Sequence, residues 1–148
     1  MIRKASRYDI PSILEMLRHY RDQTPLDFLH DADDAEYVTA MLTELIAGKG
    51  VILLAEQDGA AIGMVIAAVM PNIWSPKHHV LTEFAYWVEP EYRGGTAGYR
   101  LLRAYLDEAI ALKETGRIYN AFISKMVNSP DLKYSKFGFS KLEEFWVI

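Results

Sequence analysis

The feature that most constrains this chain is a glycine-rich run that joins a strand-like stretch to a strongly helical one. It reads EYRGGTAGYR over residues 91–100. The first N–H groups of a helix have no intrahelical acceptor, and the helix dipole favours negative charge beside them. Glycine has no Cβ, so a phosphate can approach the backbone closely. The run therefore predicts a phosphate cradle at residues 93–99. The alternative is an ordinary turn that reverses the chain before an amphipathic helix.

The composition indicates a single globular domain that spans residues 1–148. The chain is 51% hydrophobic and 24% charged, as is usual for globular proteins. Its length is sufficient to bury about two thirds of the unfolded surface. It contains no cysteine, which excludes disulfides, thiolate metal sites and a cysteine nucleophile. The same absence suits a reducing cytoplasm.

Charge and hydropathy narrow the classes of partner. The formal net charge is −4 and no basic stripe is evident, which argues against binding to a nucleic-acid backbone. No apolar run approaches the roughly 20 residues that a membrane-spanning helix needs. Residues 1–7 lack the apolar core of a signal peptide behind them. We therefore expect a cytoplasmic protein without nucleic-acid or membrane partners.

Hydrophobic periodicity predicts the order β-α-α-β-β-β-α-β-α-β, which is typical of a mixed α+β fold. The expected sheet is mostly antiparallel and central, with helices flanking it. Helices are expected over residues 9–20, 34–47, 96–112 and 129–137. Strands are expected over residues 2–5, 51–55, 61–70, 79–88, 118–124 and 139–147, with a hairpin turn at 57–60 and loops at 23–33 and 72–77.

Two separated motifs resemble those of the GCN5-related N-acetyltransferases, the GNAT superfamily. Residues 88–98 resemble the family's acetyl-CoA signature R/Q-x-x-G-x-G/A, which here runs from Arg93 to Gly98. Residues 134–139, YSKFGF, resemble its C-terminal Y-x-K-x-G-F element. The expected order of strands and helices is also that of the family fold, so the resemblance covers essentially the whole chain. A Rossmann site is disfavoured because no βαβ repeat surrounds the glycines.

The resemblance implies that an acetyl group passes from acetyl-CoA, as co-substrate, to a primary amine of a small molecule or protein. The strand before the glycine turn would pair its backbone with the pantetheine arm as an added strand does, and the loop would hold the phosphates. The implied cofactor-binding residues are Tyr86, Val88, Arg93, Gly94, Gly95, Thr96, Ala97, Gly98, Tyr99 and Asn128. Thr96 departs from the signature, which has glycine there. Because the donors are backbone groups, we expect altered loop geometry but retained binding.

Glu83 is the candidate general base. An amine must lose a proton before it attacks a thioester, and a carboxylate can take that proton directly or through a water. Glu83 is the only carboxylate within the expected strand 79–88, where burying it is costly unless it is paired or functional. Strand alternation predicts that it shares a face with Ala85 and Trp87. The alternatives are a structural ion pair or an exposed edge position, with Thr82 orienting a water instead.

Tyr134 is the candidate general acid, because the resemblance implies that it protonates the departing thiolate. The alternative is an ordinary aromatic packing residue on a short helix. At the level of the whole protein, the alternative to an active enzyme is a catalytically silent acyl-CoA-binding or interaction domain, to which the Thr96 departure gives weight.

The acceptor site and the assembly state are the least constrained features. The resemblance implies that the loop between the first two helices walls the acceptor site, and this loop carries Asp27, Phe28, Leu29, His30, Asp31, Asp33 and Asp34. The alternative is a solvated loop whose last aspartate caps the next helix. Trp74 would close the other side. No metal site is expected, since His78 and His79 would point to opposite faces of a strand. The aromatic residues of segment 139–147 would allow a homodimer.

Overall fold

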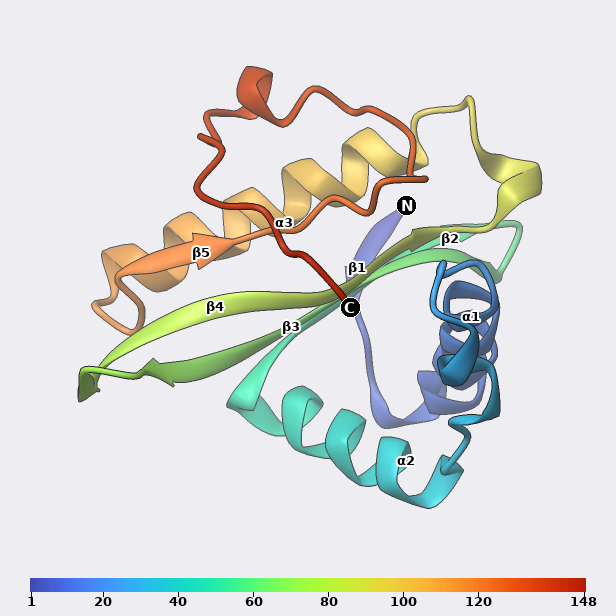
Figure 1. Cartoon of the computed structure of the whole chain (residues 1–148), viewed down its shortest axis with the longest axis horizontal. Coiled ribbons are helices and arrows are strands. Elements are labelled where there is room, and N and C mark those ends of the chain that lie inside the picture. Colours follow the sequence, from blue (N-terminus) through green and yellow to red (C-terminus); the bar gives the residue numbers. More distant parts are fainter.

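A computed structural model describes residues 1–148 as one mixed sheet with helices on both faces (Figure 1). The sheet has the order β1-β2-β3-β4-β5. Strands β1 (Ile2–Lys4), β2 (Gly50–Gln57), β3 (Ala60–Asn72) and β4 (Ser75–Val88) are antiparallel, and β5 (Asn120–Phe122) is parallel to β4. The helices are α1 (Ile10–Asp22), α2 (Ala35–Glu44) and α3 (Ala97–Glu114). The predicted α+β class is confirmed. None of the helices is long and apolar enough to cross a membrane.

The sheet separates two hydrophobic cores. Helices α1 and α2 pack on one face, where Ile13 and Leu42 are fully buried beside Met64 of β3. Helix α3 packs on the other face, where Leu101 is fully buried beside Val65. Neighbouring residues of β3 thus point into opposite cores, so this strand is apolar on both faces.

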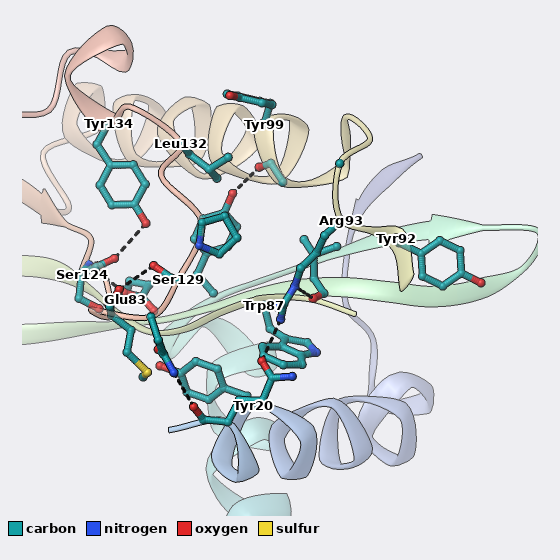
Figure 2. A pocket seen from close by; sticks show the side chains of 18 of the residues that line it. Tyr20, Glu83, Trp87, Tyr92, Arg93, Tyr99, Ser124, Ser129, Leu132 and Tyr134 are labelled. Atoms are coloured by element: carbon teal, nitrogen blue, oxygen red, sulfur yellow. Dashed lines mark hydrogen bonds between the residues drawn. The ribbon is translucent and has the colours of Figure 1, made fainter. Parts of the chain in front are cut away.

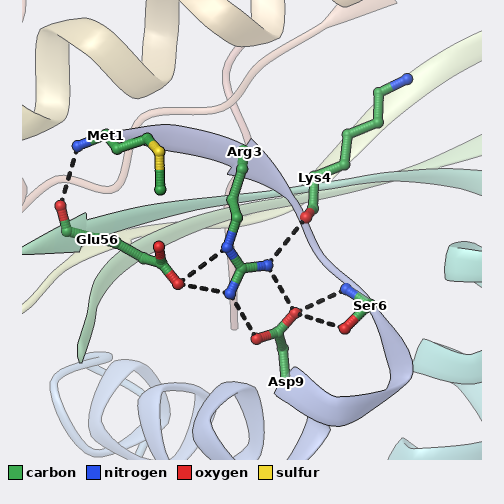
Figure 3. Close-up of polar contacts among 6 residues, drawn as sticks. All are labelled: Met1, Arg3, Lys4, Ser6, Asp9 and Glu56. Atoms are coloured by element: carbon green, nitrogen blue, oxygen red, sulfur yellow. Dashed lines mark hydrogen bonds and ion pairs between the residues drawn. The ribbon is translucent and has the colours of Figure 1, made fainter. Parts of the chain in front are cut away.

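A charged cluster fixes the start of the chain against the sheet (Figure 3). The Arg3 guanidinium donates to both carboxylate oxygens of Asp9 at 2.8 Å and also pairs with Glu56 of β2. The Ser6 N–H donates to Asp9 at 2.7 Å. The bond from Arg3 holds the pKa of Asp9 well below its usual range. The cluster therefore ties β1, β2 and the first turn before α1 together.

The connection between β3 and β4 is shorter than the loop predicted at 72–77. The Asn72 side-chain oxygen accepts the N–H groups of Trp74 and Ser75 at 2.8 and 3.0 Å. An Asn side chain that bonds the backbone two and three residues ahead closes a tight turn. Only Ile73 and Trp74 therefore lie between the strands, at an exposed hairpin tip.

Two predictions for the C-terminal third are wrong. The helix predicted at 129–137 is reduced to one short turn, Tyr134–Phe137. Pro130 lacks an N–H and disfavours the helical conformation of the residue before it. Lys133 has a φ of +56°, a left-handed conformation that interrupts a right-handed helix. The strand predicted at 139–147 is absent, because no strand edge pairs with it. Its residues from Phe145 onward are exposed. The predicted strand 118–124 is present only as the three residues of β5.

A bulge in β4 changes which face its side chains occupy. Ala85 pairs with Ile66 of β3, whereas Glu83 pairs with the next residue, Ala67, so Phe84 is the extra residue. An extra residue in one strand breaks the strict alternation of side chains. Ala85 and Trp87 belong to the core beneath α1 and α2, but Ala67, the partner of Glu83, belongs to the core beneath α3. The prediction that Glu83 shares a face with Ala85 and Trp87 is therefore wrong.

Candidate active site

A cleft opens where β4 and β5 separate. The two strands pair only at Val80, Leu81 and Thr82 of β4, and no strand covers β4 beyond that point. The Glu89 N–H donates toward β3, to the Ile62 carbonyl, at 2.8 Å. Because backbone groups alternate along a strand, those of Tyr86 and Val88 face the open edge. The cleft has a volume of about 900 Å³, including its opening to solvent.

The glycine loop forms one wall of this cleft. The first helical bond of α3 runs from the Arg100 N–H to the Thr96 carbonyl. None of the six N–H groups from Gly94 to Tyr99 donates to an acceptor within the protein. Gly94 has a φ of +92°, a conformation that side chains disfavour. A Cβ on Gly98 would lie 3.3 Å from the Tyr86 hydroxyl. The arrangement is a row of free donors at the N-terminus of a long helix.

The Arg93 side chain lies over the cleft wall instead of reaching freely into solvent. Its Nε donates to the Val88 carbonyl at 2.8 Å, and its guanidinium stacks 4.4 Å from the ring centroid of Trp87. A second nitrogen donates to Gln23, just beyond α1, at 3.4 Å. Figure 2 shows Arg93 spanning from the glycine loop toward α1. The arginine thus covers the backbone of Val88 at the open edge of β4.

Glu83 lies in the cleft with 8% of its surface exposed. Its Oε2 accepts the Ser124 N–H at 2.9 Å and the Ser124 hydroxyl at 2.7 Å (Figure 2). Burial raises the pKa of Glu83, and the two bonds from Ser124 partly oppose that rise. The carboxyl forms no ion pair. Glu83 is therefore buried without a cationic partner, and the salt-bridge and exposed-edge alternatives are wrong.

Tyr134 reaches the same serine from the other side. Its hydroxyl donates to the Ser124 carbonyl at 3.0 Å, and its ring lies 6.1 Å from that of Phe139. Burial, and to a lesser extent the charge of Glu83, raises the pKa of the Tyr134 phenol. The phenol therefore keeps its proton over the whole neutral range, as a proton donor must.

The cleft brings together most of the residues predicted from the sequence. Those that line it are Glu83, Tyr86, Val88, Arg93, Gly94, Gly95, Gly98, Tyr99, Asn128 and Tyr134. Thr96 and Ala97 instead line a smaller cavity behind the loop, and the Thr96 side chain makes no capping bond. The amide of Asn128 donates to the Gln23 carbonyl at 2.8 Å.

The segments predicted to hold the acceptor do not line the cleft. Asp33 pairs with Arg18 at 3.1 Å, and Asp34 caps α2 by accepting the Tyr37 N–H at 3.0 Å. The capping alternative for this last aspartate is confirmed. Trp74 is at the hairpin tip and is also absent from the cleft wall. The structure gathers no group of three or more histidine or acidic side chains that could hold a metal ion.

Several residues of the cleft were not predicted from the sequence. Ser124 carries no motif, and its role depends on a contact with a residue 41 positions away. Tyr20 and Gln23 come from the end of α1, which the periodicity places correctly but without any sign of a site. Trp87 packs edge-on against Tyr20, at 5.9 Å between ring centroids. In the sequence, the only sign of these cleft residues was the high aromatic content of β4, which contains Phe84, Tyr86 and Trp87.

Solved structures share this fold at low sequence identity, two of those below over the full chain. A predicted acetyltransferase from Clostridium acetobutylicum, solved with acetyl-CoA, is 17% identical with a TM-score of 0.72, covering 100% of this chain and 94% of its own. Glucosamine-6-phosphate N-acetyltransferase from Arabidopsis thaliana is 18% identical with a TM-score of 0.71, covering 100% and 96%. Ribosomal-protein-alanine N-acetyltransferase from Brucella melitensis is 24% identical with a TM-score of 0.64, covering 76% and 68%.

Sequence comparison gives the family. Curated protein sequences provide no match. The profile of the acetyltransferase (GNAT) family, however, matches residues 13–139. That range contains the open edge of β4, the glycine loop and the Tyr134 turn, and the fold agrees with acetyltransferase structures along the whole chain. The chain belongs to the acetyltransferase (GNAT) family.

Proposed function

We propose that this protein is an N-acetyltransferase that moves the acetyl group of acetyl-CoA to a primary amine, with Glu83 as general base and Tyr134 as general acid. The observation that carries the proposal is the meeting of three features in one cleft. These are the free N–H groups of the glycine loop, the open backbone edge of β4, and a buried carboxyl without a cationic partner.

The residues present fit acetyl-CoA. A pyrophosphate is held best by backbone donors at a helix N-terminus, and the free donors from Gly94 to Tyr99 supply them. A pantetheine arm carries amides that can pair with an unpaired strand edge, and the backbone of Tyr86 faces that edge. The Val88 carbonyl already accepts a bond from Arg93, so we assign this residue a weaker share of the pairing.

The proposed reaction needs three proton transfers. The protonated amine gives one proton to Glu83, directly or through a water, and its nitrogen then forms a bond to the acetyl carbon. The carbon–sulfur bond breaks, and the thiolate takes the proton of the Tyr134 hydroxyl. The nitrogen gives up its second proton to restore that hydroxyl, and after the reaction the proton on Glu83 passes to solvent. Glu83 accepts a proton readily because burial raises its pKa, and Tyr134 is protonated because burial raises its pKa as well.

The acceptor amine is proposed only as a class. The structural neighbours are named for different acceptors, glucosamine-6-phosphate and ribosomal-protein alanine, so likeness of fold does not select one. The cleft contains one carboxylate and many aromatic side chains, among them Tyr20 and Trp87. An acceptor with one amine and an apolar body suits this lining better than a polycation, which prefers several carboxylates.

Release of free CoA tests the proposal. The protein is offered acetyl-CoA with a panel of amino sugars, arylalkylamines, polyamines and peptides with free N-termini. We expect turnover with at least one of them, and a loss of about 10²–10⁴-fold in kcat for Glu83→Gln and for Tyr134→Phe. Acetyl-CoA binding by calorimetry should persist in both variants. Binding without turnover across the panel would identify a silent acyl-CoA-binding domain instead.

A further inference from the structure

Ser124 lies at the junction of the two proposed proton-transfer groups. Its N–H and its hydroxyl both donate to Oε2 of Glu83, and its carbonyl accepts the hydroxyl of Tyr134. Three polar groups of one residue are thus used to hold two side chains from different parts of the fold. Figure 2 shows Ser124 between Glu83 and Tyr134. We propose that Ser124 is the positioning residue of the site, which sets the orientation of Glu83 and Tyr134 together. This inference rests on the function proposed above.

The backbone of Ser124 makes this contact in place of a hydrogen bond within the sheet. β5 ends at Phe122, and the Ser124 N–H donates to a side-chain carboxylate instead of to a neighbouring strand. β4 contributes from its side, because the bulge at Phe84 puts Glu83 on the sheet face that α3 covers, whereas Ala85 and Trp87 point to the opposite face. A bulge beside a site re-aims a side chain in this way. Both strands therefore depart from regular pairing where Glu83 meets Ser124.

The arrangement leaves one oxygen of Glu83 for chemistry. Both donors of Ser124 bind Oε2, and Oε1 accepts no bond from the protein. Among side-chain polar atoms, only the indole nitrogen of Trp87 is fully buried without a hydrogen-bond partner. Because Oε1 also has no partner, it is not fully buried, and it is therefore in contact with the cleft space, where an amine or a water can reach it. Ser124 thus determines which carboxylate oxygen acts as the base.

No charged side chain adds to the effect of Ser124 on the pKa of Glu83. The titratable side chains whose pKa the charge of Glu83 helps to raise are tyrosines from four elements: Tyr20 of α1, Tyr86 of β4, Tyr105 of α3, and Tyr134. The hydroxyls of Tyr86 and Tyr105 are already donated to the carbonyls of Gly98 and Phe122. Hydrogen bonds to an ionised carboxylate are about twice as strong as neutral ones, so Ser124, through its N–H and its hydroxyl together, is the main stabiliser of the charged form.

The test follows the carboxyl itself and then the reaction. In Ser124→Ala the hydroxyl is lost but the N–H and carbonyl remain, whereas Ser124→Thr keeps the hydroxyl. We expect the ¹³C NMR titration midpoint of the Glu83 carboxyl, assigned with Glu83→Gln, to rise in Ser124→Ala and to return in Ser124→Thr. On the acid limb of the pH profile, kcat/KM of Ser124→Ala should be about tenfold below that of the unchanged protein. The deficit should narrow at higher pH. The KM for acetyl-CoA should not change.

Thr43→Ala is the control, since it removes a hydroxyl bonded to the backbone of α2 outside the cleft. An unchanged midpoint and pH profile in Ser124→Ala, with Glu83→Gln inactive, would overturn the role of Ser124 alone. If the midpoint moves as expected but no amine is acetylated, Ser124 still sets the charge of Glu83 and the proposed reaction fails. An equal loss of activity at every pH would show a merely structural role.

Discussion

At the scale of single residues, the distinctive feature is a buried carboxyl that has no cation to pair with. Glu83 is held by one serine and lies in a cleft that tyrosine and tryptophan side chains line. A buried charge without an ion pair lowers stability, and functional sites tolerate this because the reaction uses the perturbed group. Glu83 should therefore reduce the stability of the protein while serving its activity.

Glu83→Gln should consequently stabilise the protein at neutral pH. The folded state raises the pKa of this carboxyl above its ordinary value of 4.5. The neutral form is thus favoured in the folded state, and the stability it brings is lost as the pH rises through the folded pKa. We expect a gain of roughly 1 kcal/mol at pH 7.5 that disappears below about pH 4. Urea unfolding at both pH values measures it, and the exposed Glu143→Gln is the control. Equal gains at both pH values would contradict the argument.

At the scale of elements, α3 presents its first turn to the cleft, and two glycines with positive φ flank the helix. Gly94 precedes it with a φ of +92°, and Gly116 follows it with a φ of +77°. A Cβ on either would meet nothing within 4 Å. The two positions therefore share the same backbone strain on substitution but differ in their distance from the proposed phosphate donors.

Alanine at these two positions separates stability from binding. Gly94→Ala and Gly116→Ala should each lower the free energy of unfolding by about 1 kcal/mol, because a Cβ disfavours positive φ. Only Gly94→Ala should raise the Kd for acetyl-CoA, by roughly tenfold, through the altered direction of the free N–H groups. Calorimetric titration with acetyl-CoA decides the matter. Comparable Kd values for both variants would mean that the loop is only a turn.

At the scale of the whole molecule, contacts across the cleft hold the end of α1 to the rest of the site. His19 of α1 pairs with Glu89 at 2.7 Å, just after β4. The amide of Asn128 donates to the carbonyl of Gln23, and Arg93 donates to the Gln23 side chain. Two parts of the chain, the segment 89–93 and Asn128, therefore converge on the end of α1 and close one side of the cleft.

The His19–Glu89 contact should make this closure depend on pH. The hydrogen bond to Glu89 raises the pKa of His19 above its ordinary value of 6.5. Its stabilising effect is therefore complete below pH 6.5 and is lost as the pH rises through the folded pKa. Because the imidazole is half exposed, we expect a coupling below about 1 kcal/mol. A double-mutant cycle with His19→Gln and Glu89→Gln at pH 6 and pH 9 measures it. The same coupling at both pH values would refute the ion pair.

Local patterns in the sequence determined most of the elements and many of the residues that line the cleft. The periodicity of α1, α2 and α3, the apolar strands and the glycine run are properties of neighbouring residues, and the structure has them within a few positions. The placement of Glu83 in a buried strand follows from the same local pattern. The family resemblance of residues 88–98 and 134–139 is likewise a matter of local sequence, and the family profile confirms it.

Only the tertiary structure decided how these parts meet. The bulge at Phe84 depends on the pairing of β4 with β3, and no local signal predicts it. The bonds of Ser124 join residues 41 positions apart, and the expected terminal strand failed because strand formation needs a partner edge. The glycine run by itself specified a helix start with free donors. The separation of β4 from β5 is what placed those donors in the same cleft as a buried carboxyl, because that geometry is fixed by contacts distant in sequence.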